Sequence, residues 1–246
     1  MGLIELSGKH LLITGASSGI GRSTSILCAQ LGATLIISGR NEQRLNDTLV
    51  SLSGEGHRAI CCDQTQERDI TNMVESLPML DGIVYCAGIQ ETCLAKNVDG
   101  QVWDKLMNTN FRSTVLLNSQ ILKKKKLKKN SSVVFISSVT AFRCAEIGNA
   151  IYSSSKAAIS SYSRVLALEL APRHIRVNTV SPGMIRTPLL EQLDISQEQL
   201  SNDEHNYPFG YGNPEDVANT VVFLLSDATR WMTGADILLD GGLTLK

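Results

Sequence analysis

The residues best suited to proton chemistry in this sequence are Tyr152 and Lys156, which lie four positions apart in "IYSSSK" (151–156). On a helix, residues at this spacing share one face and come within side-chain reach. A free phenol has a pKa near ~10, and a neighbouring ammonium favours the phenolate form. The pair therefore suits a general acid–base catalyst, although the spacing alone also fits a surface coincidence.

A second group of residues is suited to binding phosphate. The stretch "TGASSGIG" (14–21) follows an apolar run and opens a helical one. In such a turn, we expect Gly15 to permit the tight bend, Gly19 to let a pyrophosphate approach the backbone, and Gly21 to let helix and strand pack closely. The helix start would add free N–H groups and a partial positive charge. The pattern predicts a dinucleotide site, and the alternative is a glycine-rich turn without a ligand.

The residues after the next two apolar runs bear on the choice of cofactor. A carboxylate after the second strand would bind the ribose 2′-hydroxyl of NAD, but this chain has Arg40 there, with Arg44 one helical turn later. A guanidinium can bind a 2′-phosphate through paired hydrogen bonds, so NADP(H) is favoured, with NAD possible. The alternative is a solvated arginine. Asp63, after the third strand, either accepts a hydrogen bond from the adenine amino group or caps the following helix.

The elements that must position these residues alternate along the chain. Strands are expected at 9–14, 33–39, 57–62, 82–88, 132–138, 175–183 and 235–242, and helices at 19–32, 41–53, 67–77, 99–129, 150–172 and 214–226. Strands that are apolar throughout are typical of parallel sheets buried on both faces, and strict alternation places helices on both sides. We predict one α/β domain over 1–246, a Rossmann-like, doubly wound parallel sheet of about seven strands. Ligands bind such sheets outside the carboxyl ends of the strands, where every motif above falls.

Composition narrows the class of protein. The chain has 246 residues, a net charge of −1, 43% hydrophobic and 19% charged residues, which fits a globular enzyme and argues against disorder. With so small a net charge, neither nucleic acid nor a membrane is expected as a partner. The six cysteines form no Cys-x-x-Cys pair and the four histidines do not cluster near them. Buried free thiols in a reducing, cytoplasmic compartment are expected, and a metal site is not.

In order and position, the motifs resemble those of the short-chain dehydrogenase/reductase family, in its common form of about this length. The resemblance covers nearly the whole chain, through "TGASSGIG" (14–21), "CAG" (86–88), "NTNF" (108–111), "ISS" (136–138), "YSSSK" (152–156), "RVNTVSPGMIRTP" (176–188) and "TGADILLDGG" (233–242). It implies an oxidoreductase that interconverts a carbonyl and a secondary alcohol by hydride transfer. The chain also resembles the 3-oxoacyl-[acyl-carrier-protein] reductases within that family.

The resemblance implies a role for each member of a catalytic tetrad. Tyr152 would protonate the carbonyl oxygen, and Lys156 would lower the pKa of that phenol and hold the nicotinamide ribose. Ser138 would hydrogen-bond the substrate oxygen, and Asn110 would bend its helix and hold a water that passes protons to Lys156. Taken singly, Ser138 also fits a strand-end serine and Asn110 a helix cap.

The resemblance also implies the binding residues. The cofactor residues would be Gly15, Ser17, Ser18, Gly19, Ile20, Gly21, Arg40, Asp63, Gln64, Ala87, Gly88, Tyr152, Lys156, Pro182, Gly183, Ile185 and Thr187. The substrate residues would be Ser138, Gln90, Arg143, Ile147, Tyr152 and Leu189. The polar, irregular segment 184–212 is expected to close over bound substrate as a lid.

Two departures from the family pattern stand out. Cys86 replaces an asparagine that usually ties neighbouring strands together, and a thiol donates only weakly. Ser138 lies one residue farther from Tyr152 than is common, which indicates an extra residue in the loop 139–151. Ser137 is therefore an alternative to Ser138, and Ser138 is preferred.

The run "KKKKLKK" (123–129) does not by itself decide whether the chain binds a protein partner. It could, together with Arg173, dock an acidic acyl carrier protein, or it could be a solvated helix end that opposes the macrodipole. By resemblance, a homotetramer or homodimer is expected, built in part on the Tyr152 helix. A non-catalytic NADP-binding regulator on the same fold is the alternative to an enzyme.

Overall fold

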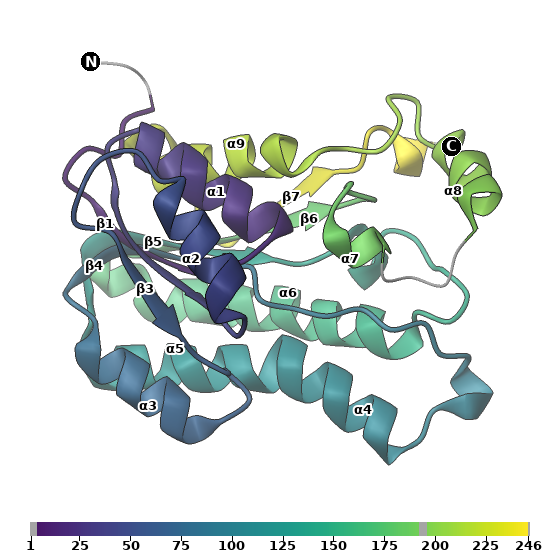
Figure 1. Cartoon of the computed structure of the whole chain (residues 1–246), viewed down its shortest axis with the longest axis horizontal. Coiled ribbons are helices and arrows are strands. Elements are labelled where there is room, and N and C mark those ends of the chain that lie inside the picture. The colour runs from purple at the N-terminus through teal and green to yellow at the C-terminus, as the bar shows by residue number, and fades with distance from the viewer. Residues whose placement is uncertain (1–3, 192–195, 246) are drawn as a thin grey trace.

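Seven parallel strands form one sheet, in the order β3-β2-β1-β4-β5-β6-β7, in the computed structural model, which describes residues 4–191 and 196–245 (Figure 1). The order reverses between β1 and β4, as in a doubly wound sheet. The predicted α/β fold class is therefore confirmed. The strands are β1 (His10–Thr14), β2 (Thr34–Gly39), β3 (Arg58–Cys61), β4 (Leu80–Tyr85), β5 (Leu127–Ile136), β6 (Arg176–Pro182) and β7 (Asp236–Leu239).

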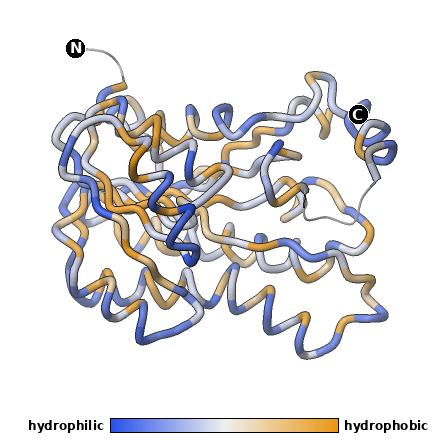
Figure 2. The backbone as a smooth tube through the Cα atoms, in the orientation of Figure 1, coloured by the Kyte–Doolittle hydropathy of each residue, from blue (hydrophilic) through white to orange (hydrophobic). Residues whose placement is uncertain are grey.

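Helices cover both faces of the sheet (Figure 1). One face carries α1 (Gly19–Gln30), α2 (Glu42–Val50) and α9 (Pro214–Leu225), and the other carries α3 (Glu67–Ser76), α4 (Gly100–Met107), α5 (Ser113–Lys123) and α6 (Ala150–Leu170). Side chains alternate between the faces: Leu11 and Ile13 pack into one core, and Leu12 packs into the other. Figure 2 shows the resulting apolar colour along the central strands. Because both faces of the sheet are covered at its centre, β1, β2 and β4 are almost entirely buried and largely apolar.

The boundary between α5 and β5 corrects the sequence prediction of one helical region over 99–129. Helix α5 ends at Lys123, and β5 begins at Leu127, which is fully buried and pairs with Leu80 of β4. Lys125, between them, has a positive φ of 53°. Lysine favours helices, but burying Leu127 in the sheet outweighs that preference. Strand β4 also ends at Tyr85 rather than at 88, so Cys86, Ala87 and Gly88 lie in the loop after it.

A π-helical segment, Asn108–Arg112, separates α4 from α5. Such segments are rare and occur often at functional sites. Here the segment turns Asn110 inward, where 2% of the residue is exposed. This is the local distortion expected of that asparagine.

The segment 184–212 contains α7 (Pro188–Glu191) and α8 (Gln197–Glu204), whereas 192–195 lie outside the described residues. Its two ends meet: Gly212 N donates to Met184 O at 3.0 Å, and Arg186 N donates to Gly212 O at 2.9 Å. Arg186 also forms an ion pair with Glu204, at the end of α8. The segment thus leaves and rejoins the body of the protein at one point.

None of the helices within the described ranges is long and apolar enough to cross a bilayer. The same residues contain no group of three or more His, Cys, Asp and Glu side chains arranged to hold a metal.

Candidate active site

Two adjoining cavities open at the carboxyl ends of the strands. The first, here called the long cleft, runs from the ends of β2 and β3 across the turn after β1, and is lined by Gly15, Ser17, Ser18, Gly19, Ile20, Gly21, Gly39, Arg40, Asn41, Arg44, Cys62, Asp63, Gln64, Thr65, Cys86, Ala87, Gly88, Ile89, Thr109, Ser113, Thr187, Pro188 and Leu189. The second, the inner pocket, lies beside α6 and is lined by Ile20, Cys86, Gly88, Ile89, Gln90, Ile136, Ser137, Ser138, Tyr152, Lys156, Pro182, Gly183, Met184, Ile185, Thr187, Leu189 and Leu190. The residues common to both make the two cavities continuous.

The glycine turn packs too tightly for any side chain. Gly15 has a φ of +65°, and a Cβ there would lie 2.7 Å from the backbone nitrogen of Ala87. A Cβ on Gly21 would collide with the carbonyl oxygen of Gly15. Ser18 precedes α1 without capping it through its side chain, so the first N–H groups of this helix remain available at the cleft. This arrangement fits a pyrophosphate.

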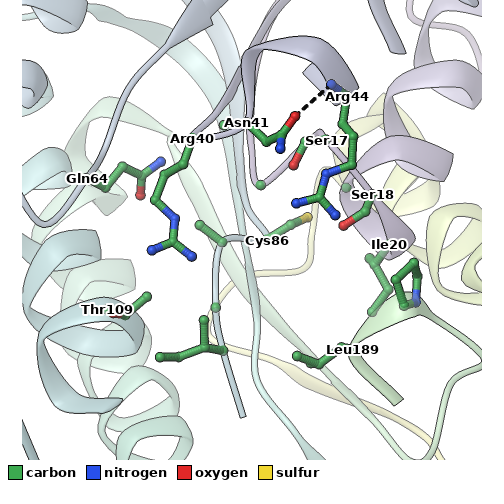
Figure 3. Close-up of a pocket in the computed structure, with 18 of the residues that line it drawn as sticks. Ser17, Ser18, Ile20, Arg40, Asn41, Arg44, Gln64, Cys86, Thr109 and Leu189 are labelled. Atoms are coloured by element: carbon green, nitrogen blue, oxygen red, sulfur yellow. Dashed lines mark hydrogen bonds between the residues drawn. The ribbon is translucent and has the colours of Figure 1, made fainter. Parts of the chain in front are cut away.

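Two arginines occupy the far end of the long cleft. In Figure 3, the guanidinium groups of Arg40 and Arg44 both extend into the cavity. Asn41 begins α2, and its Oδ1 accepts a hydrogen bond from Arg44 N at 2.9 Å, which fixes the start of the helix that carries Arg44. The lining contributed by this region consists of Gly39, Arg40, Asn41 and Arg44. It presents two positive charges and no carboxylate, as a 2′-phosphate would require.

The turn after β3 supplies Asp63 and Gln64 to the cleft. Asp63 Oδ1 accepts hydrogen bonds from the backbone and hydroxyl of Thr65, at 3.0 and 2.8 Å. The carboxylate thus closes the turn before α3, whose N-cap is Gln66 rather than Asp63. Gln64 is 7% exposed, and its Oε1 has no hydrogen-bond partner among the described residues. A buried, unpaired carbonyl oxygen is costly, which is consistent with a ligand completing this end of the cleft.

Tyr152 and Lys156 lie together on α6, at the inner pocket. Lys156 Nζ is 5.8 Å from the centroid of the Tyr152 ring and donates to Ile136 O, at the end of β5, at 3.0 Å. Burial lowers the pKa of Lys156 to about 8. Burial raises the pKa of Tyr152 to about 12, while the side chain of Ser138 acts in the opposite direction. At neutral pH the phenol therefore keeps its proton and most of the lysine keeps its charge.

The two serines at the end of β5 have different partners. Ser137 Oγ donates to Lys156 O at 3.0 Å and pairs with Ser160 Oγ at 2.8 Å, so it joins the strand to α6. Ser138 Oγ accepts from Thr140 N at 3.2 Å and pairs with Thr140 Oγ1 at 3.0 Å. Both serines contribute to the wall of the inner pocket, but the Ser137 hydroxyl is already committed to α6.

Asn110 lies behind the wall of the site and lines neither cavity. Its Oδ1 accepts from Ile89 N at 2.8 Å, and its Nδ2 donates to Ile89 O at 2.9 Å and to Ser155 Oγ at 3.0 Å. A Cβ on Gly88 would lie 3.3 Å from both Asn110 Oδ1 and Lys156 Nζ. Asn110 therefore holds the loop after β4 against α6, next to the lysine.

Cys86 lies in the wall that the two cavities share. Burial raises the pKa of its thiol to about 12, so the sulfur stays protonated. The backbone nitrogens of Cys86 and Ala87 both donate to Thr14 Oγ1, at 3.2 and 3.3 Å. Thr14 thus ties β1 to the loop after β4, the kind of connection that the family's asparagine usually makes.

Two of the residues predicted to bind substrate, Arg143 and Ile147, lie outside both cavities. The guanidinium carbon of Arg143 lies 5.0 Å from the ring centroid of Phe142, and Ile147 is 89% exposed. Gly148, which follows Ile147, has a positive φ of 84°. Conversely, Met184, Leu190, Thr109 and Ser113 line the cavities and were not predicted. The signal that could have indicated them is proximity in the sequence, because each lies within three positions of Pro182, Thr187 or Asn110.

Comparisons with known proteins identify relatives along nearly the whole chain. Residues 15–244 match a family model described as enoyl-(acyl carrier protein) reductase. The chain is 34% identical over 244 residues to a 3-oxoacyl-[acyl-carrier-protein] reductase of Rickettsia felis, which covers 99% of this chain and 100% of the relative. It is 32% identical over 239 residues to carbonyl reductase family member 4 of Danio rerio, at 95% and 97% coverage. A short-chain type dehydrogenase/reductase of Mycobacterium marinum matches with a TM-score of 0.90 and 31% identity, over 99% and 98% of the two chains.

The buried lysine should make stability depend on pH. The folded protein lowers the pKa of Lys156 from 10.5 to about 8, so between these values the unfolded chain binds more protons. The free energy of unfolding should rise through this window by up to about 1.4 kcal/mol per pH unit. Lys156→Met removes this effect. The free energy of unfolding of the variant minus that of the wild type should therefore fall from pH 7 to about pH 9.5.

Urea unfolding at the two pH values measures that difference. Lys129→Met, at an exposed position, is the matched control and should show a difference that does not change with pH. A pH-independent difference for Lys156→Met would mean that Lys156 is not held in the disfavoured charged state.

Proposed function

The chain belongs to the short-chain dehydrogenase/reductase family of oxidoreductases, which act on CH–OH groups with NAD(P), and from this premise we propose that it is an NADPH-dependent 3-oxoacyl-[acyl-carrier-protein] reductase. The observation that carries the proposal is the end-to-end match to reductases of that name, joined to a pocket that brings Ser138, Tyr152 and Lys156 together. Reduction of a 3-oxoacyl group is one case of the broader activity, which is the interconversion of a carbonyl and a secondary alcohol.

The long cleft would hold NADPH. The turn around Gly15, Gly19 and Gly21 would receive the pyrophosphate, Arg40 and Arg44 the 2′-phosphate, and the region of Asp63 and Gln64 the adenine. When bound, the nicotinamide supplies a hydride to the carbonyl carbon. A protein that only sensed NADP would need this cleft but would have no use for the acid–base pair in the inner pocket.

In the inner pocket, Tyr152 would donate its proton to the carbonyl oxygen as the hydride arrives. Ser138 would donate a hydrogen bond to the same oxygen and stabilise its developing charge. The positive charge of Lys156 would then stabilise the phenolate that remains. Asn110 would act through position, since its carboxamide holds the backbone of Ile89 on one side and Ser155 on the other.

The acyl part of the substrate would lie between the loop after β4 and the segment 184–212. Gln90, Met184, Leu189 and Leu190 line this side of the inner pocket. We propose that 184–212 closes over the substrate as a lid, hinged where Met184 and Gly212 pair. The ion pair between Arg186 and Glu204 would hold α8 to the hinge during that motion.

The lysine run bears on how a carrier protein could dock. Lys124 pairs with Glu75, Lys126 donates to Leu77 O at 2.5 Å, and Lys128 pairs with Asp81. The run lies at the amino end of β5, whose ten residues span about 30 Å to the site at the other end. The guanidinium of Arg173 is bonded to Leu127 O beside it. A carrier docked on this run would lie about 30 Å from the site of the same chain. We propose that it would serve the site of a second copy of the chain.

Assembly of several copies is part of the proposal. Three large apolar side chains are exposed on α4 and α6, namely Trp103, Val165 and Leu168, at 47%, 55% and 77%. A homotetramer or homodimer that packs these helices together would bury them. Cytoplasmic location is proposed with it, because all six cysteines are free.

The activity is tested by following NADPH oxidation with a 3-oxoacyl-carrier substrate against simple ketones, keto-sugars and hydroxysteroid ketones. The proposal expects the highest kcat/KM with the carrier-bound substrate, and a loss of that advantage at high salt if the lysine run docks the carrier. A preference for free ketones would instead favour a carbonyl reductase, the activity named for the Danio rerio relative. Silence across the panel with tight NADPH binding would favour the regulator.

Tyr152→Phe should reduce turnover by about 10²–10⁴-fold, because it removes the proton donor while leaving the ring in place. Binding of NADPH, measured by its fluorescence, should change little. Tyr162→Phe is the control: Tyr162 is on the same helix but accepts from Asn118 Nδ2 outside both cavities. Turnover retained in Tyr152→Phe would refute the assignment of Tyr152 as the acid.

Arg40→Ala should weaken NADPH binding by about 10–100-fold and leave NADH binding nearly unchanged, since a charged hydrogen bond contributes about 1.5–3 kcal/mol. Arg44→Ala should have the same effect in smaller measure. Arg68→Ala, an exposed position on α3 away from the cleft, is the control. Equal turnover of NADH and NADPH by the wild-type protein at matched subsaturating concentrations would exclude the preference.

A further inference from the structure

Thr140 is bonded to Ser138 through both its backbone N–H and its hydroxyl group. It lies in the 3₁₀ turn Val139–Ala141 that follows β5, and it is 7% exposed. Its backbone N–H donates to Ser138 Oγ at 3.2 Å, and its hydroxyl oxygen lies 3.0 Å from the same atom. Within residues 4–191 and 196–245, that hydroxyl has no other hydrogen-bond partner. The two contacts determine what Ser138 can do.

The direction of the hydroxyl pair follows from counting protons and lone pairs. A serine hydroxyl has one proton and two lone pairs. The backbone N–H of Thr140 can only donate, so it fills one lone pair of Ser138. If the Thr140 hydroxyl also donates, it fills the second, and the Ser138 proton is left to point elsewhere. If the pair runs the other way, the Ser138 proton is turned toward Thr140 and lost to the pocket.

The surroundings of Ser138 favour the first direction. Ser138 lines the inner pocket with Tyr152, and among the described residues its hydroxyl is bonded only to Thr140. In the proposed reaction, Ser138 must offer its proton to the reacting oxygen beside Tyr152. That proton is available only when Thr140 donates to Ser138.

We propose that Thr140 is a positioning residue whose hydroxyl makes Ser138 an obligate hydrogen-bond donor to the reacting oxygen. The inference rests on the proposed function, because the reacting oxygen is the carbonyl oxygen of that reaction. The hydroxyl is not needed for the turn itself, since the backbone N–H of Thr140 already completes the cap on Ser138. A valine at 140 would keep the shape and this N–H, and would remove only the second donor.

The test is a double-mutant cycle in the intact chain. Thr140→Val should lower kcat with the best carbonyl substrate by about 3–10-fold and leave KM and NADPH affinity nearly unchanged, as expected for loss of one hydrogen bond that acts in the transition state. Thr140→Ser should restore the rate. In the Ser138→Ala background, Thr140→Val should have no further effect.

Two outcomes would overturn the inference. One is an unchanged kcat in Thr140→Val. The other is an equal loss with and without Ser138, which would mean that Thr140 acts through packing. Thermal unfolding of each variant identifies any that fold poorly, and Thr140→Ser retains the test if the valine variant does so.

A second readout needs no turnover and keeps the inference separate from the proposed function. In the complex with NADP⁺, whose positive ring favours phenolate, the ultraviolet absorbance of Tyr152 phenolate can be titrated against Tyr152→Phe. Thr140→Val should raise the midpoint of this titration, Ser138→Ala should raise it at least as much, and the double variant should match Ser138→Ala. If the wild type reduced no substrate, the proposed function would fail, and this titration would still decide whether Thr140 directs the Ser138 proton. An unmoved midpoint in Thr140→Val would overturn the inference.

Discussion

The close contact between the turn after β1 and the loop after β4 is the constraint on which the site depends. The strand order reverses at this point, so the connections leaving β1 and β4 separate and leave a crevice. A side chain on Gly15 would enter the backbone of Ala87, while Thr14 accepts from both Cys86 N and Ala87 N. This contact brings the long cleft against the inner pocket. In the proposed reaction, a wider gap here would separate the hydride donor from the proton donor, however well each was bound.

The inner pocket places opposing demands on its two ionisable groups. Burial alone would remove the charge from Lys156 and keep the proton on Tyr152. The charged lysine donates a hydrogen bond to Ile136 O, a carbonyl at the open end of β5, and Ser138 opposes the effect of burial on the pKa of the phenol. A protonated phenol with a cation close by would suit the proposed carbonyl reduction, because the acid would be loaded before the reaction and its conjugate base stabilised after it. The same burial that destabilises the charged lysine therefore prepares the site.

The sequence predicted the sheet and the cleft well because both depend on local rules. Apolar runs that alternate with amphipathic stretches determine a doubly wound sheet, and the two cavities, one lined by Gly15 and Arg40 and the other by Tyr152, lie at the carboxyl ends of its strands. Predictions were wrong where tertiary contacts outweighed local preference. Lys128 and Lys129 belong to a strand because Leu127, just before them, pairs with Leu80 in the core. Arg143 and Ile147 line neither cavity, and their contact with substrate stays a prediction.

The two serines after β5 show why neighbouring polar residues are hard to assign from sequence. Their hydroxyls are chemically identical, and the strand alternation that separates them is the only signal in the sequence. In the structure, Ser137 is bonded to Lys156 O and Ser160 on α6, whereas Ser138 caps the turn that holds Thr140. A capping serine is ordinarily an acceptor, which is the opposite of what an oxygen-stabilising residue must be. The same turn resolves the conflict, because a serine whose lone pairs are both filled by Thr140 has only its proton left to offer.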